Sequence, residues 1–469
     1  MKERFSTWVE RHQDQLVTMS DTIWEFAEVG LREHRSADLL ASVLEGAGFA
    51  VERGVAGLPT AFVATYGNRG PVIGLLGEYD ALPGLAQDRV PYRSPKNGRA
   101  GHGCGHNLLG VAAAAAAMAV AEAIQDGSLA GTVRFFGCPA EETLVGKVFM
   151  ARAGLFDGLD AALTWHPGSS NTVWASSTAM NSARFTFYGR TAHAAANPDR
   201  GRSALDGVEL MNIGVNYLRE HVIPEARIHY VITHGGGEPN VVPARAQVWY
   251  YVRAPRRDQV DEIFQRVLDV SRGAAIMTGT TFDVEILTAC YNVLPNHSLG
   301  ALLMANLESN GGPAFTREDV EFASRLVESF EPGQLEAAAR SQKLPETLAS
   351  QVLNTATVPP QDPNWVMAGS TDVGDVSWIV PTAQLVTACC PVGTAGHSWQ
   401  FTAASGSGMG HRGMLLAARV LAGTVAELLA SPGHLAEARA EFGRATKDTP
   451  YRCALPAGAL PPLDQLGEH

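Results

Sequence analysis

The sequence is poor in charge and in cysteine, and it has no apolar run long enough to suggest a membrane span. Charged residues make up 18% of the 469 residues, and 48 Asp and Glu outnumber 36 Lys and Arg. The resulting formal charge of -12 opposes binding to phosphate backbones and anionic lipid surfaces. We therefore expect neither a nucleic-acid partner nor a membrane partner.

The few cysteines and the start of the chain bear on the compartment. Six cysteines occur, and Cys389 and Cys390 are adjacent, a distribution that does not indicate a disulfide framework. The chain starts MKERFSTWVERHQDQLV, which is charged and amphipathic and lacks the apolar core of a secretory signal. The longest apolar run, 108–121, is too short for a bilayer and consists mostly of alanine. It predicts a tightly packed buried helix, and the expected compartment is the cytoplasm.

Strand-like and helical patterns alternate through the first part of the chain. Helical periodicity at 5–47 and near 147–153 alternates with β-rich segments, which lie at 61–67, 71–80, 132–138 and 160–166. This order predicts an α/β catalytic domain with a mainly parallel sheet flanked by helices. In such sheets, ligands bind at the carboxyl ends of the strands.

A second type of unit interrupts this pattern. Four strand-like segments flank two helical ones between 181 and 289, which predicts an inserted α+β domain, with 1–180 and 290–469 forming one discontinuous catalytic domain. We further expect a strand over 376–391, a last helix over 414–430 and a peripheral tail from residue 450. The polar stretch 331–364 has no interpretable pattern.

The densest chemical signal is the segment GHGCGHN at 101–107. Imidazole and thiolate are usual ligands of zinc-like metals, and glycines allow the tight turns that converging ligands need. Residues two apart in an extended segment project to one side, so Cys104 and His106 can address one site. The alternative is a glycine-rich turn with incidental histidines.

Adjacent carboxylates follow the strand-like segment 132–138. Glu141 and Glu142 point in different directions, so one can bind a metal while the other holds or deprotonates a water. Taken alone, an acidic helix N-terminus explains them better.

Further polar residues lie after strand-like segments. They are Asp80, His166, His193 and His397. Asp80 can orient a ligand histidine or simply form a turn. Each lone histidine is by itself better explained as structural, but their shared placement at strand ends favours a common site. The polar loop 369–375 is explained equally well as a helix cap and turn.

The motifs together resemble a known family. GEYDALPG, GHGCGHN, PAEET, TWHP, TAHAAANPDRGRSALDG, EPNVVPARAQVWYYVR, GSTDVGDVSW and GTAGHSWQ occur in the order seen in the aminoacylase and glutamate-carboxypeptidase family of two-metal amidohydrolases. Between about residues 24 and 430, the chain is most similar to the p-aminobenzoyl-glutamate hydrolase branch. The resemblance implies a ferredoxin-like lid that also makes a dimer.

The resemblance also implies roles for individual residues. Cys104 would bridge two divalent metals, in the position that many relatives fill with Asp. His106 and His166 would complete one metal site, and Glu142 and His397 the other. Asp80 would orient a ligand.

The remaining implied roles concern catalysis and substrate binding. Glu141 would be the general base that takes a proton from the attacking water and later protonates the leaving amine. His193 on the lid would reach the partner's active site and stabilise the oxyanion, while Asn240 and Arg253 would bind the substrate's carboxylate or carbonyl.

Two departures refine these expectations. Asn107 follows His106, where many relatives have Asp, and 197–199 lacks a histidine that some amino-acid-conjugate hydrolases carry; both fit the aminobenzoyl-glutamate branch. A thiolate ligand favours zinc, whereas manganese is common in cysteine-containing relatives.

Alternatives for the substrate and the partner stay open. The expected substrate is a small aryl-acyl amino acid, and the alternatives are an N-acyl amino acid, a dipeptide or an aromatic amine that is deaminated. A metal-binding protein without catalysis is disfavoured because Glu141 and all the ligands are present. The expected assembly is a homodimer, with a homologous second chain as the alternative partner.

Overall fold

The computed structural model describes residues 1–96, 98–174, 176–341, 344–345, 351–360, 362 and 365–463. Its larger part is built on a seven-stranded sheet in the order β1-β2-β4-β3-β5-β13-β6. The strands are β1 (Ala50–Arg53), β2 (Phe62–Tyr66), β3 (Val72–Glu78), β4 (Thr132–Cys138), β5 (Ala161–Gly168), β6 (Thr172–Trp174) and β13 (Thr382–Ala388). The four central strands, β4, β3, β5 and β13, are parallel, and the flanking pairs are antiparallel.

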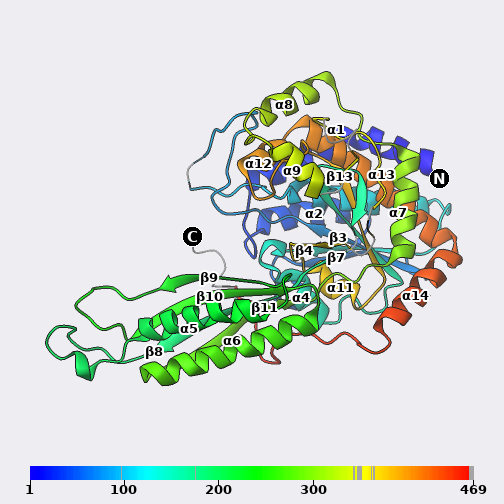
Figure 1. Ribbon diagram of the computed structural model, residues 1–469. Helices are drawn as coiled ribbons and strands as arrows, with labels where there is room; N and C mark the ends of the chain where they lie inside the picture. The colour runs from blue at the N-terminus through cyan, green and yellow to red at the C-terminus, as the bar shows by residue number, and fades with distance from the viewer. Residues whose placement is uncertain are drawn as a thin grey trace.

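Helices cover both faces of this sheet (Figure 1). One face packs against α1 (Lys2–Phe26), α2 (His34–Gly46), α3 (His106–Gln125), α7 (His297–Asn310) and α13 (Gly408–Ala430), and the other against α4 (Gly146–Arg152) and α11 (Val373–Ser377). Alternation along the strands explains the two cores: Leu75 faces the first and Leu76 the second. Among the described residues, this part of the protein also contains α8 (Arg317–Val327), α9 (Gln334–Ser341), α12 (Trp399–Ser405) and α14 (Pro432–Thr446).

Two helices are long and apolar enough to cross a membrane by length and composition alone. They are α3 and α13, and 89% and 83% of their most apolar windows are buried inside the protein. The alanines of α3 let it pack closely against the sheet and α13, as the apolar run at 108–121 predicts. Packing in the protein core therefore explains the length and apolar composition of both helices.

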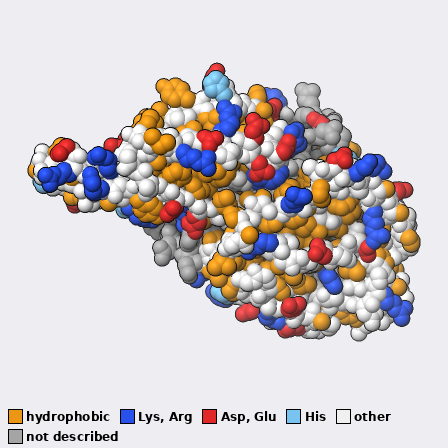
Figure 2. Space-filling model, turned by 90° about the horizontal axis from the view of Figure 1, so that it is seen from below, with side chains coloured by type: hydrophobic (Ala, Val, Ile, Leu, Met, Phe, Trp, Pro, Cys, Tyr) orange, Lys and Arg blue, Asp and Glu red, His pale blue; other side chains and the backbone are white. Residues whose placement is uncertain are grey.

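A second sheet forms an arm that projects from the larger part (Figures 1 and 2). Its order is β11-β8-β10-β9, with every neighbouring pair antiparallel. The elements follow a βαββαβ order: β8 (Ala179–Tyr188), α5 (Ala204–Leu218), β9 (Arg227–His234), β10 (Arg245–Ala254), α6 (Arg257–Thr278) and β11 (Thr281–Cys290). This is a ferredoxin-like arrangement, and we call it the lid. The predicted fold class is confirmed.

The structure corrects three details. The expected strand over 376–391 begins in helix α11, and only β13 is extended. The helix α14 follows α13, so the expected last helix is not the last. The described tail packs against the core beside α11 through Leu455 and Tyr451.

A two-stranded sheet of β7 (Ser176–Ser177) and β12 (Val366–Met367) connects the stretch after α9 to the base of the lid. Part of the uninterpreted stretch 331–364 lies outside the described residues.

Candidate metal centre

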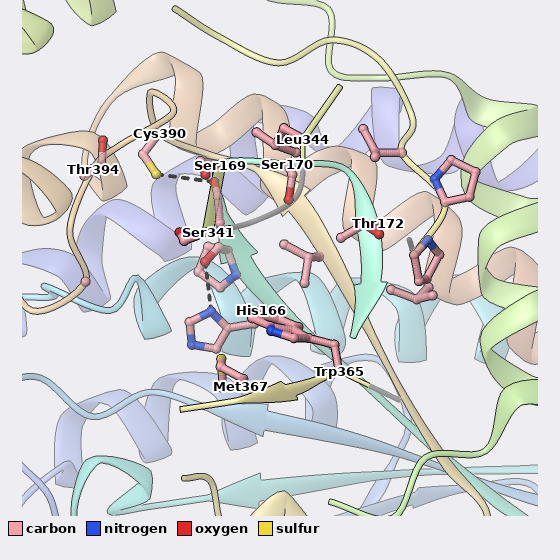
Figure 3. A pocket seen from close by; sticks show the side chains of 18 of the residues that line it. His166, Ser169, Ser170, Thr172, Ser341, Leu344, Trp365, Met367, Cys390 and Thr394 are labelled. Carbon is pink, nitrogen blue, oxygen red and sulfur yellow. Dashed lines mark hydrogen bonds between the residues drawn. The ribbon is translucent and has the colours of Figure 1, made fainter. Parts of the chain in front are cut away.

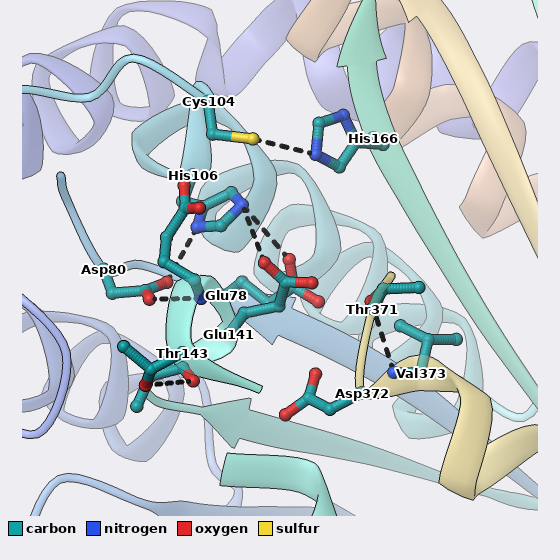
Figure 4. Close-up of polar contacts among 12 residues, drawn as sticks. Glu78, Asp80, Cys104, His106, Glu141, Thr143, His166, Thr371, Asp372 and Val373 are labelled. Carbon is teal, nitrogen blue, oxygen red and sulfur yellow. Dashed lines mark hydrogen bonds and ion pairs between the residues drawn. The ribbon is translucent and has the colours of Figure 1, made fainter. Parts of the chain in front are cut away.

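The predicted metal ligands lie together where the central parallel strands end. Figure 4 shows Cys104, His106 and His166 among them. Asp80 follows β3, Glu141 and Glu142 follow β4, His166 lies near the end of β5, His397 follows β13, and Cys104 and His106 enter α3. The carboxyl ends of parallel strands meet at one edge, so residues far apart in sequence converge there.

Five side chains form two overlapping groups. The ligand atoms of Cys104, His106 and His166 lie within 4.8 Å of one another, and those of Cys104, Glu142 and His397 do the same. Cys104 Sγ is 3.3 Å from His166 Nε2, and Glu142 Oε2 is 3.1 Å from His397 Nε2. The thiol of Cys104 is shared by the two groups, which are the two ligand sets that the family resemblance implies.

The orientation of His106 is typical of a metal ligand. Its Nδ1 lies 2.7 Å from Asp80 Oδ1, and the other Asp80 oxygen accepts a hydrogen bond from the Glu142 backbone at 2.9 Å. Burial alone would raise the pKa of Asp80, but His106 holds it below its usual value. A carboxylate on one ring nitrogen fixes the tautomer, so that Nε2 presents its lone pair to the centre.

Two buried polar atoms without a hydrogen bond are consistent with a pocket that fits cations. His106 Nε2 and Glu142 Oε1 are buried and have no hydrogen-bond partner among the described residues. Such orphaned atoms cost free energy unless a ligand satisfies them. The set of imidazoles, a carboxylate and a thiol matches the preferences of zinc and of similar divalent ions.

Unusual backbone conformations build the ligand loops. Gly105, which precedes α3, has φ +76°, and a Cβ there would lie 2.7 Å from Pro167. Ala140 and Leu144 bracket the turn that carries the two glutamates, and both have positive φ although they are not glycine. Strain of this kind gathers at functional sites, where the surrounding structure must hold it. Here Glu33 accepts a hydrogen bond from the Ala140 amide at 2.7 Å.

Glu141 lies beside both ligand groups and is buried. Its Oε2 is 3.8 Å from His106 Nε2. Burial and the neighbouring Glu78 raise its pKa well above the usual range. A carboxylate whose proton affinity is raised is a better general base near neutral pH than an exposed one.

A buried charged triad under the centre was not anticipated from the sequence. Lys147 Nζ lies 2.6 Å from Glu78 Oε1 and 2.5 Å from Asp372 Oδ1, and the Lys147 side chain has no exposed surface. Glu78 Oε2 in turn lies 3.4 Å from His106 Nε2. The one sequence signal for this triad was Lys147 among the apolar residues of α4, because a buried lysine requires a partner.

Three predicted residues lie on the lid, and only one is near the centre. The ten residues of β8 span about 30 Å. His193 and Asn240 lie beyond its far end, where Ala194 donates a hydrogen bond to the Asn240 carbonyl. Arg253 lies at the near end, and its Nη1 donates to Ser370 Oγ at 3.2 Å.

His102, the other histidine of the glycine-rich segment, belongs to none of the ligand groups among the described residues. Its Nε2 lies 3.0 Å from the Ile23 carbonyl oxygen. It therefore anchors the loop to α1.

Comparison with known proteins identifies the family. Residues 74–398 match Peptidase family M20/M25/M40. The chain belongs to this family. The matched segment includes Glu78 and His397, and therefore the whole candidate metal centre. The predicted resemblance and the predicted enzyme class, a hydrolase of this family, are confirmed.

The chain has relatives that match almost its whole length. It is 42% identical over 466 residues to one of the subunits of p-aminobenzoyl-glutamate hydrolase from Escherichia coli (strain K12), covering 97% of each chain. It is 30% identical over 458 residues to Xaa-Arg dipeptidase of Mus musculus, covering 94% of this chain and 92% of that one.

Solved structures share the M20 fold at low identity. An aminobenzoyl-glutamate utilization protein from Klebsiella pneumoniae has a TM-score of 0.59 at 18% identity, covering 89% of this chain and 97% of that one. A dinuclear metal-binding M20 peptidase from Bacillus subtilis has a TM-score of 0.55 at 17% identity, with 90% and 99% covered.

Proposed function

We propose that this M20 hydrolase uses two divalent metal ions to cleave the amide bond between an acyl or aryl-acyl group and an amino acid. The observation that carries the proposal is the convergence of two ligand groups on Cys104 beside the buried Glu141. The 42% identical relative, a p-aminobenzoyl-glutamate hydrolase subunit, supports an aroyl-glutamate as the first substrate to test. The Xaa-Arg dipeptidase relative makes a dipeptide the second candidate.

The metals would be held by the five converging side chains. His106 and His166 would bind one ion, Glu142 and His397 the other, and Cys104 both. When bound, the ions would polarise the amide carbonyl and lower the pKa of the attacking water. Zinc and manganese are the proposed ions: the thiol favours zinc, and the imidazoles and carboxylate accept either.

Glu141 would move the proton. It takes one from the attacking water and gives it to the leaving amine, and burial raises its affinity for that proton in the interval. Asp80 acts on the reaction through His106, whose ring it orients.

The lid residues would bind the substrate. Arg253 offers a planar guanidinium for a carboxylate, and its Nε is buried without a partner among the described residues. His193 and Asn240 lie too far from their own centre, so we propose that they serve the centre of a second protomer, His193 at the oxyanion and Asn240 at the substrate's polar groups.

The lid supports a homodimer as the proposed assembly. Strand β9 is an edge of its sheet and exposes Val231 and Ile232, and α5 exposes Ile213 and Tyr217. Unpaired edges and exposed apolar side chains are typical of surfaces that associate. The alternative is a related second chain: another p-aminobenzoyl-glutamate hydrolase subunit of Escherichia coli (strain K12) is 27% identical over 276 residues.

The cysteines support a reducing compartment, and we propose the cytoplasm. All six cysteines are free thiols. Cys104 in particular must stay reduced to bind a metal.

The test is hydrolysis by metal-loaded protein. Manganese- and zinc-loaded wild type and Glu141→Gln are assayed against p-aminobenzoyl-glutamate, an N-acyl amino acid, an Xaa-Arg dipeptide and an aryl amine, with products identified by mass. The expected result is amide cleavage that Glu141→Gln lowers at least 100-fold while both metals are retained. Equal activity of wild type and Glu141→Gln would refute the proposed mechanism. Ammonia release from the aryl amine would show deamination instead of the proposed amide hydrolysis.

A further inference from the structure

Lys147, Glu78 and Asp372 form a buried charged cluster next to the metal centre, outside the two ligand groups that share Cys104. The side chains of Lys147 and Asp372 have no exposed surface, and that of Glu78 has 3%. A cavity of about 340 Å³ lies beside His166 (Figure 3), and none of the three residues lines it. Charged groups that reach neither solvent nor this cavity can act on a reaction only through their neighbours.

Two carboxylates face the same imidazole nitrogen. Glu78 Oε2 lies 3.4 Å from His106 Nε2, and Glu141 Oε2 lies 3.8 Å from it. Figure 4 marks both contacts, and the ligand atoms of these three residues lie within 4.8 Å of one another. Either carboxylate is placed to hold a water or to bind a metal, so distance alone does not select the general base.

Lys147 distinguishes the two carboxylates. Its Nζ lies 2.6 Å from Glu78 Oε1, so that Glu78 has a charged contact at each of its two oxygens. Among the described residues, the one ion pair of Glu141 is its longer contact with His106. Glu78 is therefore restrained on both sides, whereas Glu141 is restrained on one.

Asp372 fixes Lys147 in turn. Its Oδ1 lies 2.5 Å from Lys147 Nζ, and its Oδ2 accepts a hydrogen bond from the Lys147 backbone amide at 2.7 Å. Burial alone would lower the pKa of Lys147, but Asp372 and Glu78 hold it well above its usual value. The side chain is therefore a cation, and Lys147 is the second residue of α4, directly after the turn that carries Glu141.

We propose that Lys147 is a positioning residue of the reaction, a role that rests on the proposed amidohydrolase function. It holds Glu78 as a stationary carboxylate, which leaves Glu141 free to take the proton from the attacking water. Without the ammonium group, Glu78 would be a buried carboxylate with no compensating charge at Oε1, and pairing with another cation would lower its free energy. The proposed metals are the nearest such cations, so Glu78 would join their ligands and compete with the attacking water.

The experiment compares Lys147→Met, Glu78→Gln and the double variant with wild type. The metal-loaded proteins are assayed for kcat and KM on p-aminobenzoyl-glutamate, and zinc affinity is measured by competition with a chelator. Lys147→Met keeps the backbone amide that binds Asp372. Asp319→Ala, which removes the capping box of α8, is the control for a loss of stability outside the ligand groups.

Lys147→Met should lower kcat about 10–100-fold with little change in KM, the usual effect of removing a group that supports a metal site. It should also bind zinc more tightly than wild type, because the released Glu78 adds a ligand. In the double variant, kcat and zinc affinity should return to the values of Glu78→Gln alone. Asp319→Ala should keep the wild-type kcat.

A double variant as slow as Lys147→Met would overturn the proposal, because the loss would then not pass through Glu78. Zinc binding in Lys147→Met that is no tighter than in wild type would overturn it as well. If circular dichroism shows that Lys147→Met does not fold, the double variant decides alone, and a kcat below that of Glu78→Gln refutes the role. A wild-type enzyme inactive on every substrate would overturn the proposed function instead, while the zinc affinities still test the restraint on Glu78.

Discussion

His106 Nδ1 lies 2.7 Å from Asp80 Oδ1. This contact orients the His106 ring so that its Nε2 faces the predicted metal centre. The second Asp80 oxygen fixes the backbone of Glu142, so one buried carboxylate positions ligands of both groups. Asp80 is therefore the residue through which the geometry of one group affects the other.

Asp80→Ala should lower metal affinity about 10–100-fold, the usual effect of removing a group that orients a ligand. Competition with a chelator measures the affinity. Asp88→Asn is the matched control because Asp88 lies in the following loop and pairs with Lys96. Unchanged affinity in Asp80→Ala would show that His106 does not need this support.

Cys104→Ala should reduce the metal content by more than one ion per chain on average, because both ligand groups include this thiol. Cys104→Asp should retain two ions, since a carboxylate can also bridge. Elemental analysis of the purified protein gives the ratio. Cys453→Ser, at another half-buried thiol, controls for loss of a cysteine; two ions in Cys104→Ala would remove this residue from the centre.

Lys147→Met should destabilise the protein by about 3–5 kcal/mol, because it leaves Glu78 and Asp372 buried without their cation. Urea unfolding measures the loss. Lys2→Met, which removes an exposed pair with Glu427, should cost about 0–1 kcal/mol.

A double variant separates charge from packing in the same triad. Adding Asp372→Asn to Lys147→Met removes one of the uncompensated carboxylates and should recover part of the stability. If the double variant is no more stable than the single one, the lysine stabilises the protein by packing alone.

Mixing two inactive variants tests whether the lid acts between protomers. Glu141→Gln and His193→Ala should each be nearly inactive, and dimers formed after mixed refolding should recover up to about a quarter of wild-type activity, since half the dimers are mixed and each mixed dimer has one intact site. Steady-state assays and native mass spectrometry follow the exchange. Mixed dimers without activity would place His193 in the chemistry of its own protomer or outside the chemistry altogether.

Local patterns predicted that the candidate ligands converge, because these residues follow strands. The segment 132–138 became β4 with those limits, and the placement of Glu141 and Glu142 followed from it. The strand expected over 376–391 was partly wrong, because Pro381 separates the short helix α11 from β13 while apolar residues fill both. The sequence pattern reports burial, and burial does not distinguish these two conformations.

Local sequence patterns did not predict polar pairs between residues that are far apart in the sequence. Lys147 and Asp372 are 225 positions apart, and nothing local indicates that they meet. The cavity beside His166 has the same origin, because its wall joins β6 to residues after α9. Motifs indicate which side chains can bind metals, whereas the walls of a cavity depend on tertiary packing.

Asp375 should make stability depend on pH near neutrality. Burial raises its pKa to about 7, although Tyr451 donates a hydrogen bond to it at 2.7 Å. In the unfolded chain this carboxyl ionises near pH 4. Between about pH 4 and 7 the folded protein therefore holds more protons, and the free energy of unfolding falls as the pH rises.

Asp375→Asn removes this fall in the free energy of unfolding with rising pH. The free energy of unfolding of the variant, relative to wild type, should therefore increase from pH 4.5 to about 7 and then level off. Urea unfolding at half-unit pH steps measures the difference, and Asp199→Asn at an exposed site is the control. Parallel curves for wild type and Asp375→Asn would mean that the carboxyl is ionised in the folded state throughout. In that case its contacts with Tyr451 and the Tyr291 amide outweigh its burial.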